Sequence, residues 1–435
     1  MNRVTAGTQA PGPEQPFDLD ANDETLPFLQ RLMHQYGDTC RVRAKTRAAD
    51  SLVIHCPDDI RRVLLTNRRN YVKGVGMERI RMLLGNGLIV SEGEFWARQR
   101  RMIQPAFHSR VIRQFSGLIR QHNLALLERL ADHADTASPV NITREMSEVT
   151  LQIVLRSLFS TDLDRLVEKE GRNPFDLLTH ESQRDLEFAA RFRTLTRAVR
   201  QMIHARRHER RIETDFLSML MEARDKESGE PMPERVLVDE MMTLIVAGHE
   251  TTASVLNWTW YLLSQDPDAE ARLHAAITAA PAAEALTIED ALAASYVQQV
   301  LKESMRLYPP VWLFNRRAIA DDRLGGFDVP AGTDIFVCPY LLHRHAGHWQ
   351  APDEFRPERF EAHAEKQRHT FAYLPFSAGP RHCVGEGFAM AEMAMHVTML
   401  AARFRLEYCG PALPAPEFQI NLRTRQDLQM RVRAR

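Results

Sequence analysis

Apolar residues recur with helical spacing along most of the chain, which predicts a mainly α protein. The longest predicted helix spans residues 234–264 and is ended by Asp266-Pro267. Another starts at a capping box, Thr287 to Asp290, and continues to Leu307, where Pro309-Pro310 stops it. Further helices are predicted at residues 57–66, 92–103, 110–133, 142–159, 185–212 and 383–403.

Segments with strand character are few and short. Residues 51–56, residues 334–339 and parts of the tail from Phe418 are the candidates, and Gly325-Gly326 marks a turn. Small sheets therefore accompany the helices. No low-complexity linker or repeat divides the chain, so we expect a flexible N-terminal segment, 1–24, followed by one domain, 25–435.

Composition excludes several classes of protein. The 435 residues are 44% hydrophobic and carry a formal net charge of −1, which gives a nucleic-acid partner no electrostatic support. Five cysteines without a paired spacing favour a reducing compartment over a disulfide framework. No stretch of about 18 apolar residues is present, so we expect no transmembrane anchor and a cytoplasmic location.

One loop carries the strongest chemical signal in the chain. Cys383 stands before a predicted helix, where its thiolate can serve as an axial ligand of haem iron. Gly379 permits a tight turn, Gly385 lets the backbone pass close to a flat cofactor, and Arg381 offers a cation to a haem propionate. The alternative is a buried structural cysteine in a glycine-containing loop.

This loop resembles the haem-binding loop of the cytochrome P450 family, Phe-x-x-Gly-x-Arg-x-Cys-x-Gly, with Phe376 at the first position. The resemblance extends from about residue 25 to the C-terminus. It implies the family fold, mainly α with small β-sheets, with haem b between the long mid-chain helix and the cysteine-loop helix. It also implies a soluble, bacterial-type member, because no anchor segment is visible.

A second motif, Ala247-Gly248-His249-Glu250-Thr251, lies in the middle of the longest predicted helix. A glycine there costs about 1 kcal/mol relative to alanine, which is expected where a helix bends or another group approaches closely. The motif resembles the oxygen-activation pattern of the family. That resemblance implies that Ala247 and Gly248 border a groove for dioxygen, and that Glu250 and Thr251 deliver protons to it. The alternative is a helix kink whose polar side chains bond to the preceding turn.

Glu303 and Arg306 are three residues apart and share one face of a helix. Alone, such a pair is usually a surface salt bridge worth less than about 1 kcal/mol. With Arg359 downstream, the arrangement resembles the structural Glu-Arg-Arg triad of the family.

Two further segments resemble those that supply cations to the haem propionates. Trp96 and Arg100 match the Trp-x-x-x-Arg helix, although Arg98 or Arg101 could take that place. Arg316 occupies the strand position that supplies another arginine. Because Arg316 and Arg317 point to opposite faces of a strand, only one can serve, and we favour Arg316.

Basic residues gather in two other places. Residues 191–211 contain eight arginines, with Phe192, Leu195, Val199 and Ile203 on one face, which predicts an amphipathic helix with a basic outer face. Such a face is usually only solvated; the alternatives are steering of an acidic substrate and contact with an anionic surface. A docking patch for an acidic ferredoxin is a further hypothesis, formed by Arg98, Arg101, Arg110 and Arg113.

Together the motifs predict a haem-dependent monooxygenase that uses dioxygen and hydroxylates a small organic molecule. Electrons from NAD(P)H would arrive through a ferredoxin or flavodoxin and its reductase. Oxidative cyclisation, coupling or desaturation is an alternative, as is a non-enzymatic gas sensor or electron carrier. The resemblance places the pocket near residues 71–90 and 176–190 and suggests a largely apolar lining, formed by Val246, Ala247, Val311, Leu313 and Phe314.

Overall fold

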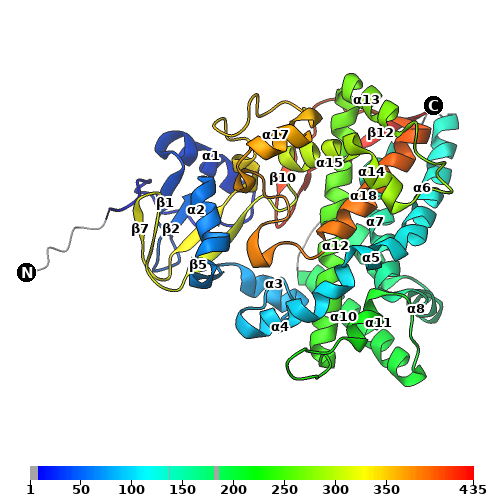
Figure 1. Cartoon of the computed structure of the whole chain (residues 1–435), viewed down its shortest axis with the longest axis horizontal. Helices are drawn as coiled ribbons and strands as arrows, with labels where there is room; N and C mark the ends of the chain where they lie inside the picture. The colour runs from blue at the N-terminus through cyan, green and yellow to red at the C-terminus, as the bar shows by residue number, and fades with distance from the viewer. Residues whose placement is uncertain (1–7, 137, 181–185) are drawn as a thin grey trace, which may run out of the picture. The chain divides into compact units, whose positions relative to one another are not determined.

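A computed structural model describes residues 8–136, 138–180 and 186–435 (Figure 1). The chain forms two compact units, each built from three separate stretches of sequence. Unit 1 contains residues up to 77, residues 302–383 and residues 415–425. Unit 2 contains residues 78–301, residues 384–414 and residues 426–435.

Unit 1 is organised around a five-stranded sheet in the order β1-β2-β8-β5-β3. The β2 and β8 strands are parallel, with Ser51 opposite Asp334, and the other neighbours are antiparallel. Buried aliphatic residues such as Ile54, Ile60 and Ile335 form the core on this sheet. The strands are β1 (Thr39–Val42), β2 (Ser51–Ile54), β3 (Tyr71–Lys73), β5 (Phe314–Ala318) and β8 (Asp334–Val337).

Two hairpins and several short helices complete unit 1. Gly325 and Gly326, both with positive φ, form the turn of one hairpin, as the sequence predicts. The hairpins are β6 (Asp322–Leu324) with β7 (Phe327–Val329), and β10 (Pro416–Phe418) with β11 (Leu422–Thr424). The helices are α1 (Thr25–Tyr36), α2 (Pro57–Arg61), α16 (Pro339–Leu342) and α17 (Ala362–Gln367).

Residues 8–24 are packed against the rest of unit 1. Ala10 and Leu19 are buried, and the ring of Phe17 stacks on that of Phe28 at 4.1 Å. The amide of Arg41 donates a hydrogen bond to the carbonyl of Pro11. This segment therefore contributes to the hydrophobic core of the unit.

Unit 2 is helical, and α12 (Glu234–Gln265) is its longest described helix. This helix packs along α7 (Ile142–Phe159) and also contacts α10 (Leu186–Glu209) and α18 (Glu386–Arg403). A three-stranded sheet has the order β4-β12-β9, formed by β4 (Pro139–Asn141), β12 (Gln429–Ala434) and β9 (Phe404–Tyr408).

The other helices of unit 2 are all shorter than α12, and α3 begins at the boundary with unit 1. They are α3 (Met77–Leu84), α4 (Gly93–Ile103), α5 (Ser109–Ile112), α6 (Ser116–Thr136), α8 (Asp162–Glu170), α9 (Leu177–His180), α11 (Phe216–Glu222), α13 (Pro267–Ile277), α14 (Ile288–Ala293) and α15 (Ser295–Leu307), whose last turns belong to unit 1.

The predicted helices are confirmed, with two corrections. The helix predicted over residues 110–133 is divided into α5 and α6 by a short 3-10 helix, Arg113–Phe115. The helix predicted from Thr287 to Leu307 is two helices, α14 and α15, separated at Ala294, whose ψ of 90° is not helical. The capping box is present, since the side chains of Thr287 and Asp290 each accept from the other's backbone amide. The periodicity misses this break because Ala294 is itself a strong helix former.

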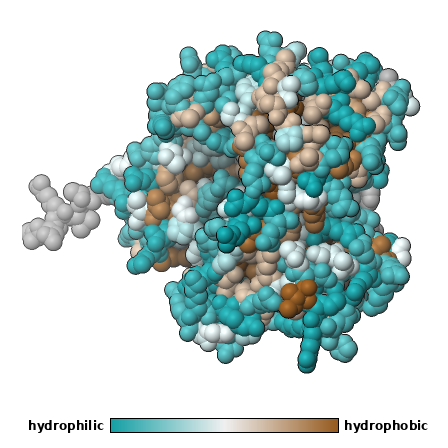
Figure 2. Space-filling model, turned by 45° about the vertical axis from the view of Figure 1, so that its right-hand side comes forward, coloured by the Kyte–Doolittle hydropathy of each residue, from teal (hydrophilic) through white to brown (hydrophobic). Residues whose placement is uncertain are grey.

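The described surface is mostly polar. Figure 2 shows hydrophobic atoms scattered among hydrophilic ones on the face drawn. Among the described residues, no helix is long and apolar enough to cross a membrane.

Candidate active site

The loop before α18 is held by its own backbone. The amide of Cys383 donates to the carbonyl of Phe376 at 2.9 Å, and that of His382 donates to Gly379 at 3.0 Å. Gly379 has a φ of 69°, and a Cβ there would lie 2.1 Å from the carbonyl oxygen of Leu64. Any side chain at position 379 would therefore strain the backbone and displace the neighbouring chain.

Cys383 differs from the other four cysteines in its surroundings. Its side chain is exposed, whereas Cys40 and Cys338 are buried and Cys56 and Cys409 are half-buried. Burial raises the pKa of both Cys40 and Cys338 to about 12, which keeps these thiols protonated. An accessible sulfur, three residues before the N-terminus of α18, fits the thiolate ligand of a haem.

The two neighbouring arginines of β5 have different partners. Arg317 donates two hydrogen bonds to Asp334, at 2.9 and 3.0 Å, and Arg47 binds the same carboxylate. Arg316 is buried; one of its nitrogens donates to the carbonyl of Asn315. Asp334 therefore neutralises Arg317.

Glu303, Arg306 and Arg359 are brought together in unit 1. Both oxygens of the fully buried Glu303 accept from Arg306, at 2.7 and 2.8 Å, and Arg359 lies 3.3 Å away. Arg306 also donates to the carbonyls of His343, Pro352 and Glu354. The pair is thus a buried crosslink between α15 and the segment 343–359, not a surface salt bridge.

In α12 the predicted oxygen-activation motif is an uninterrupted piece of helix. The hydroxyl of Thr251 donates to the carbonyl of Ala247 at 2.5 Å, and the ring of His249 lies 3.0 Å from the hydroxyl of Ser147 in α7. A Cβ on Gly248 would approach the side chain of Val154 to 2.9 Å. Gly248 therefore allows the close approach of α7, one of the two reasons expected for a glycine here.

The arginines of α4 also divide according to their partners. Arg98 and Arg101 both face the carboxylate of Asp225, at 3.2 and 3.8 Å. Arg100 lies on another part of the helix, with its Nε 3.4 Å from the side chain of Gln104, and Trp96 is half-buried one turn earlier. The partners of Arg100 therefore differ from those of Arg98 and Arg101. This arrangement weakens the predicted ferredoxin patch, because acidic residues neutralise Arg98 and Arg101.

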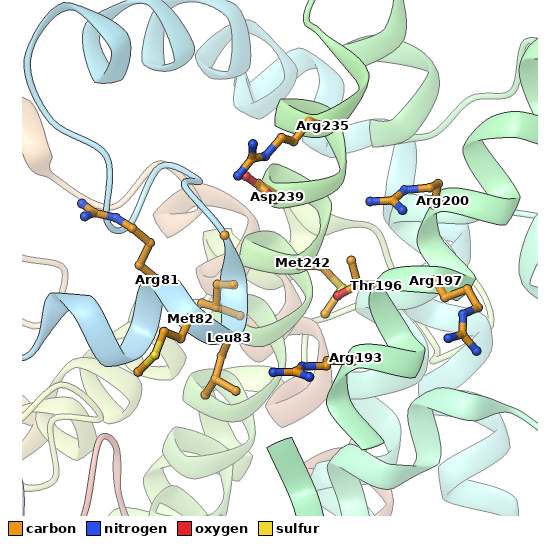
Figure 3. A pocket seen from close by; sticks show the side chains of 12 residues that line it. Arg81, Met82, Leu83, Arg193, Thr196, Arg197, Arg200, Arg235, Asp239 and Met242 are labelled. Carbon is orange, nitrogen blue, oxygen red and sulfur yellow. The ribbon is translucent and has the colours of Figure 1, made fainter. Parts of the chain in front are cut away.

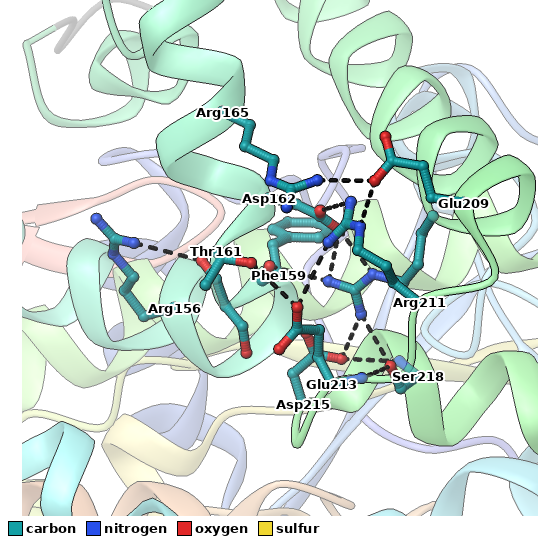
Figure 4. A network of polar contacts seen from close by, with 12 residues as sticks. Arg156, Phe159, Thr161, Asp162, Arg165, Glu209, Arg211, Glu213, Asp215 and Ser218 are labelled. Carbon is teal, nitrogen blue, oxygen red and sulfur yellow. Dashed lines mark hydrogen bonds and ion pairs between the residues drawn. The ribbon is translucent and has the colours of Figure 1, made fainter.

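The predicted basic helix, α10, has the expected apolar face but not a wholly basic outer one. Phe192, Leu195, Val199 and Ile203 are buried. Arg206 is fully buried as well, which corrects the prediction for that residue: it donates to Asp162, Asp215 and the carbonyl of Phe159. Figure 4 shows these three acceptors, Asp162, Asp215 and Phe159, within one network of polar contacts. These carboxylates come from α8 and the N-cap of α11, so spacing within α10 could not reveal them.

Sequence reasoning missed two adjacent carboxylates of α12. Asp239 accepts from the amide of Asn86, and the buried Glu240 accepts from that of Leu88, both at 2.9 Å (Figure 3 shows Asp239). Burial, together with repulsion from Asp239, raises the pKa of Glu240 to about 8. Two acids in an otherwise apolar helical stretch were the available signal. They hold the loop 85–88, within the segment predicted to line the pocket.

The remaining predicted pocket residues line no single described cavity. Val246 and Ala247 are half-buried in α12, and Leu313 and Phe314 are half-buried in unit 1, where Val311 is exposed. Residues 181–185 of the predicted segment 176–190 lie outside the described residues.

Comparison with known proteins decides the family. The sequence model of the family described as Cytochrome P450 matches residues 17–427 of the chain. The chain belongs to the cytochrome P450 family. Cyclooctatin synthase of Streptomyces melanosporofaciens is 32% identical, over 93% of this chain and 89% of its own. Cyclooctat-9-en-7-ol 5-monooxygenase of the same organism is also 32% identical, over 93% of both chains.

The fold comparison agrees. The haem domain of cytochrome P450DA has a TM-score of 0.84 over 99% of this chain and 98% of its own, at 22% identity. The predicted fold, mainly α with small sheets, is therefore confirmed. As a P450 monooxygenase, the protein uses a haem cofactor and electrons derived from NAD(P)H and delivered by partner proteins.

Proposed function

We propose that this P450 binds haem b through Cys383 and hydroxylates a largely apolar small molecule such as a lipid, terpenoid or aromatic natural product. The proposal depends most on Cys383, which is the exposed cysteine in a loop that matches every fixed position of the family motif. Electrons would come from NAD(P)H through a ferredoxin or flavodoxin and its reductase, in the cytoplasm.

Bound haem would supply the iron at which dioxygen is activated. The residues of this chain would hold and orient it: Cys383 through its sulfur, and Arg381, Arg316 and Arg100 through the propionates. Phe376, Gly379 and Gly385 would shape the loop around the sulfur.

Glu250 and Thr251 would move protons. The Thr251 hydroxyl donates to the carbonyl of Ala247, and because a hydroxyl can rotate, it could instead donate its proton toward the haem side of the helix. Glu250 is adjacent and only half-buried, which leaves it able to exchange protons with water.

Hydroxylation is favoured over other outcomes because relatives of the chain are named as monooxygenases. Besides the cyclooctat-9-en-7-ol 5-monooxygenase, carotene epsilon-monooxygenase of Arabidopsis thaliana is 28% identical over 95% of this chain. Val246 and Ala247 contribute apolar surface on the helix that carries Glu250 and Thr251. Oxidative cyclisation or desaturation would use the same residues and is distinguished by the product.

The thiolate is tested by Cys383→Ser, with Cys56→Ser as the matched control. The reduced carbon monoxide complex of the wild type and of the control should show the thiolate-type spectrum, and Cys383→Ser should lose it together with turnover. A thiolate spectrum that survives in Cys383→Ser would refute the assignment.

The proton path is tested by Thr251→Ala. This variant should bind substrate but divert electrons from NAD(P)H to hydrogen peroxide, so that product formed per NAD(P)H falls. Thr259→Ala is the control, because Thr259 makes an equivalent hydrogen bond to Val255 in the same helix. Equal coupling in the two variants would contradict the role of Thr251.

A further inference from the structure

Unit 2 contains a surface cavity of about 450 Å³ formed by three helices. Its walls come from the end of α3, from α10 and from the first turns of α12 (Figure 3). It adjoins the loop 85–88 that Asp239 and Glu240 hold.

The cavity is strongly basic. Five arginines line it against one carboxylate, that of Asp239, which already accepts from the amide of Asn86. In Figure 3, Arg193 and Arg200 point from α10 toward the open space, and Arg235 lies beside Asp239. The lining arginines are Arg81, Arg193, Arg197, Arg200 and Arg235.

These arginines contrast with the others on the same helix. Arg206 and Arg207 each form an ion pair with a carboxylate, at 2.5 and 2.6 Å, and Arg211, just beyond the end of the helix, does so at 2.5 Å. Within the described part of the chain, the structure records no such ion pair for Arg193 or Arg200. Like charges gathered in one cavity repel each other, and an anionic group placed among them would relieve that repulsion.

The same cavity has an apolar side. Met82, with 78% of its surface exposed, Leu83 and Met242 belong to its lining. Met242, Val246 and Glu250 follow each other at four-residue intervals along one ridge of α12. Since the helix rises 1.5 Å per residue, this ridge leads from the cavity to Glu250 over about 12 Å.

We propose that the cavity binds the anionic head group, a carboxylate or a phosphate, of an amphiphilic substrate whose apolar body lies along the Met242–Val246–Glu250 ridge. This inference rests on the proposed function, which it narrows from apolar molecules in general to apolar molecules with an acidic end. Arg193 and Arg200 contact the head group, and Met82 and Leu83 contact the start of the apolar body.

Equilibrium dialysis of the haem-loaded enzyme tests this assignment without turnover. The probes are hexadecanoate, hexadecyl phosphate and the neutral hexadecan-1-ol. At least one of the two anions should bind more tightly than the alcohol, and the tighter one identifies the head group. Added salt should weaken the binding of that anion and leave the alcohol unaffected.

Arg193→Gln and Arg200→Gln should each weaken the binding of the anion about fivefold, and the double variant more, with little change for the alcohol. Arg405→Gln, an exposed arginine of β9 outside the cavity, is the control for the change in net charge. Equal binding of anions and alcohol, or equal losses in the cavity variants and the control, would overturn the proposal.

Sedimentation with anionic vesicles distinguishes a substrate site from a membrane contact. If Arg193 and Arg200 are needed for sedimentation with phosphatidylserine vesicles but not for binding either free anion, the cavity is a membrane contact and the proposal is wrong. The reduced carbon monoxide spectrum of the double variant is recorded in parallel. A normal thiolate spectrum keeps the proposed function intact whatever the dialysis shows.

Discussion

At the scale of single residues, the buried carboxylate of Glu303 accepts hydrogen bonds from three different arginines of unit 1. Besides Arg306 and Arg359, it accepts from the amide of Arg356 at 2.8 Å. Removing one partner of a buried ion pair leaves the other charge uncompensated, which costs far more than the net value of the pair.

We therefore expect Glu303→Ala to lower the free energy of unfolding by about 3–5 kcal/mol, measured by urea denaturation of the haem-loaded protein. Glu365→Ala is the control, because Glu365 pairs with Lys302 at 2.7 Å at a partly exposed site and should cost less than about 1 kcal/mol. Similar losses in the two variants would show that the buried crosslink does not stabilise unit 1.

In unit 2, Arg206 likewise belongs to a fully buried ion pair. Arg206→Leu should cost about 3–5 kcal/mol in urea denaturation, because it leaves Asp215 buried without its cation. The adjacent Arg207→Leu is the control: Arg207 is exposed and pairs with Glu234, so its loss should cost less than about 1 kcal/mol. A loss as small as that of the control would contradict the role given to Arg206.

These two arginines also show what local spacing can reveal. Arg306 and Glu303 are three residues apart in one helix, so their contact follows from helical geometry. The partners of Arg206 lie in other elements, 44 and 9 residues away along the chain. Eight arginines in a short segment look like a solvated face until those partners are known.

At the scale of elements, α12 and α7 pack closely because Gly248 lacks a side chain. In an exposed helix, Gly→Ala would gain about 1 kcal/mol. Here the new Cβ would approach Val154 to 2.9 Å, so we expect Gly248→Ala to cost about 1–3 kcal/mol in urea denaturation. Val154→Ala should restore part of that loss in the double variant. Additive effects of the two substitutions would refute the contact.

Long, strongly periodic helices are the elements that the sequence predicts best. Helix α12 ends within about a residue of its predicted limits because Asp266-Pro267 stops it. The pattern of residues does not predict the short strands β1, β3 and β9, and only the family resemblance places Arg316 and Arg317 of β5 on a strand. Three to five residues carry too little alternation to distinguish a strand from a loop, and only pairing with a distant strand defines them.

At the scale of the whole molecule, each unit is assembled from stretches far apart in sequence. The pairing of β2 with β8 places Ser51 beside Asp334, and β12 joins β4 to β9 near the C-terminus. Hydrophobic periodicity cannot predict which of two distant strands will pair. The arrangement of the elements is predicted only by the resemblance to the family. The local pattern of residues predicts only which segments are helices and which are strands.

Stability of the whole molecule should depend on pH through Glu240. Its pKa is raised from 4.5 to about 8, so the folded state favours the protonated form. The contribution of the protonated Glu240 to the free energy of unfolding is therefore complete below about pH 4.5 and is lost as the pH rises through about 8. Glu240→Gln keeps a carbonyl to accept from the amide of Leu88 but cannot ionise.

We therefore expect the stability of Glu240→Gln to increase relative to that of the wild type as the pH rises. The difference in their free energies of unfolding should grow by up to about 1.4 kcal/mol per pH unit between pH 5 and 8, then level off. Urea denaturation across this range measures it, with the exposed Glu128→Gln as control. A difference that stays constant with pH would mean that Glu240 is ionised in the folded protein, and that the loop 85–88 is held by a carboxylate rather than by a neutral acid.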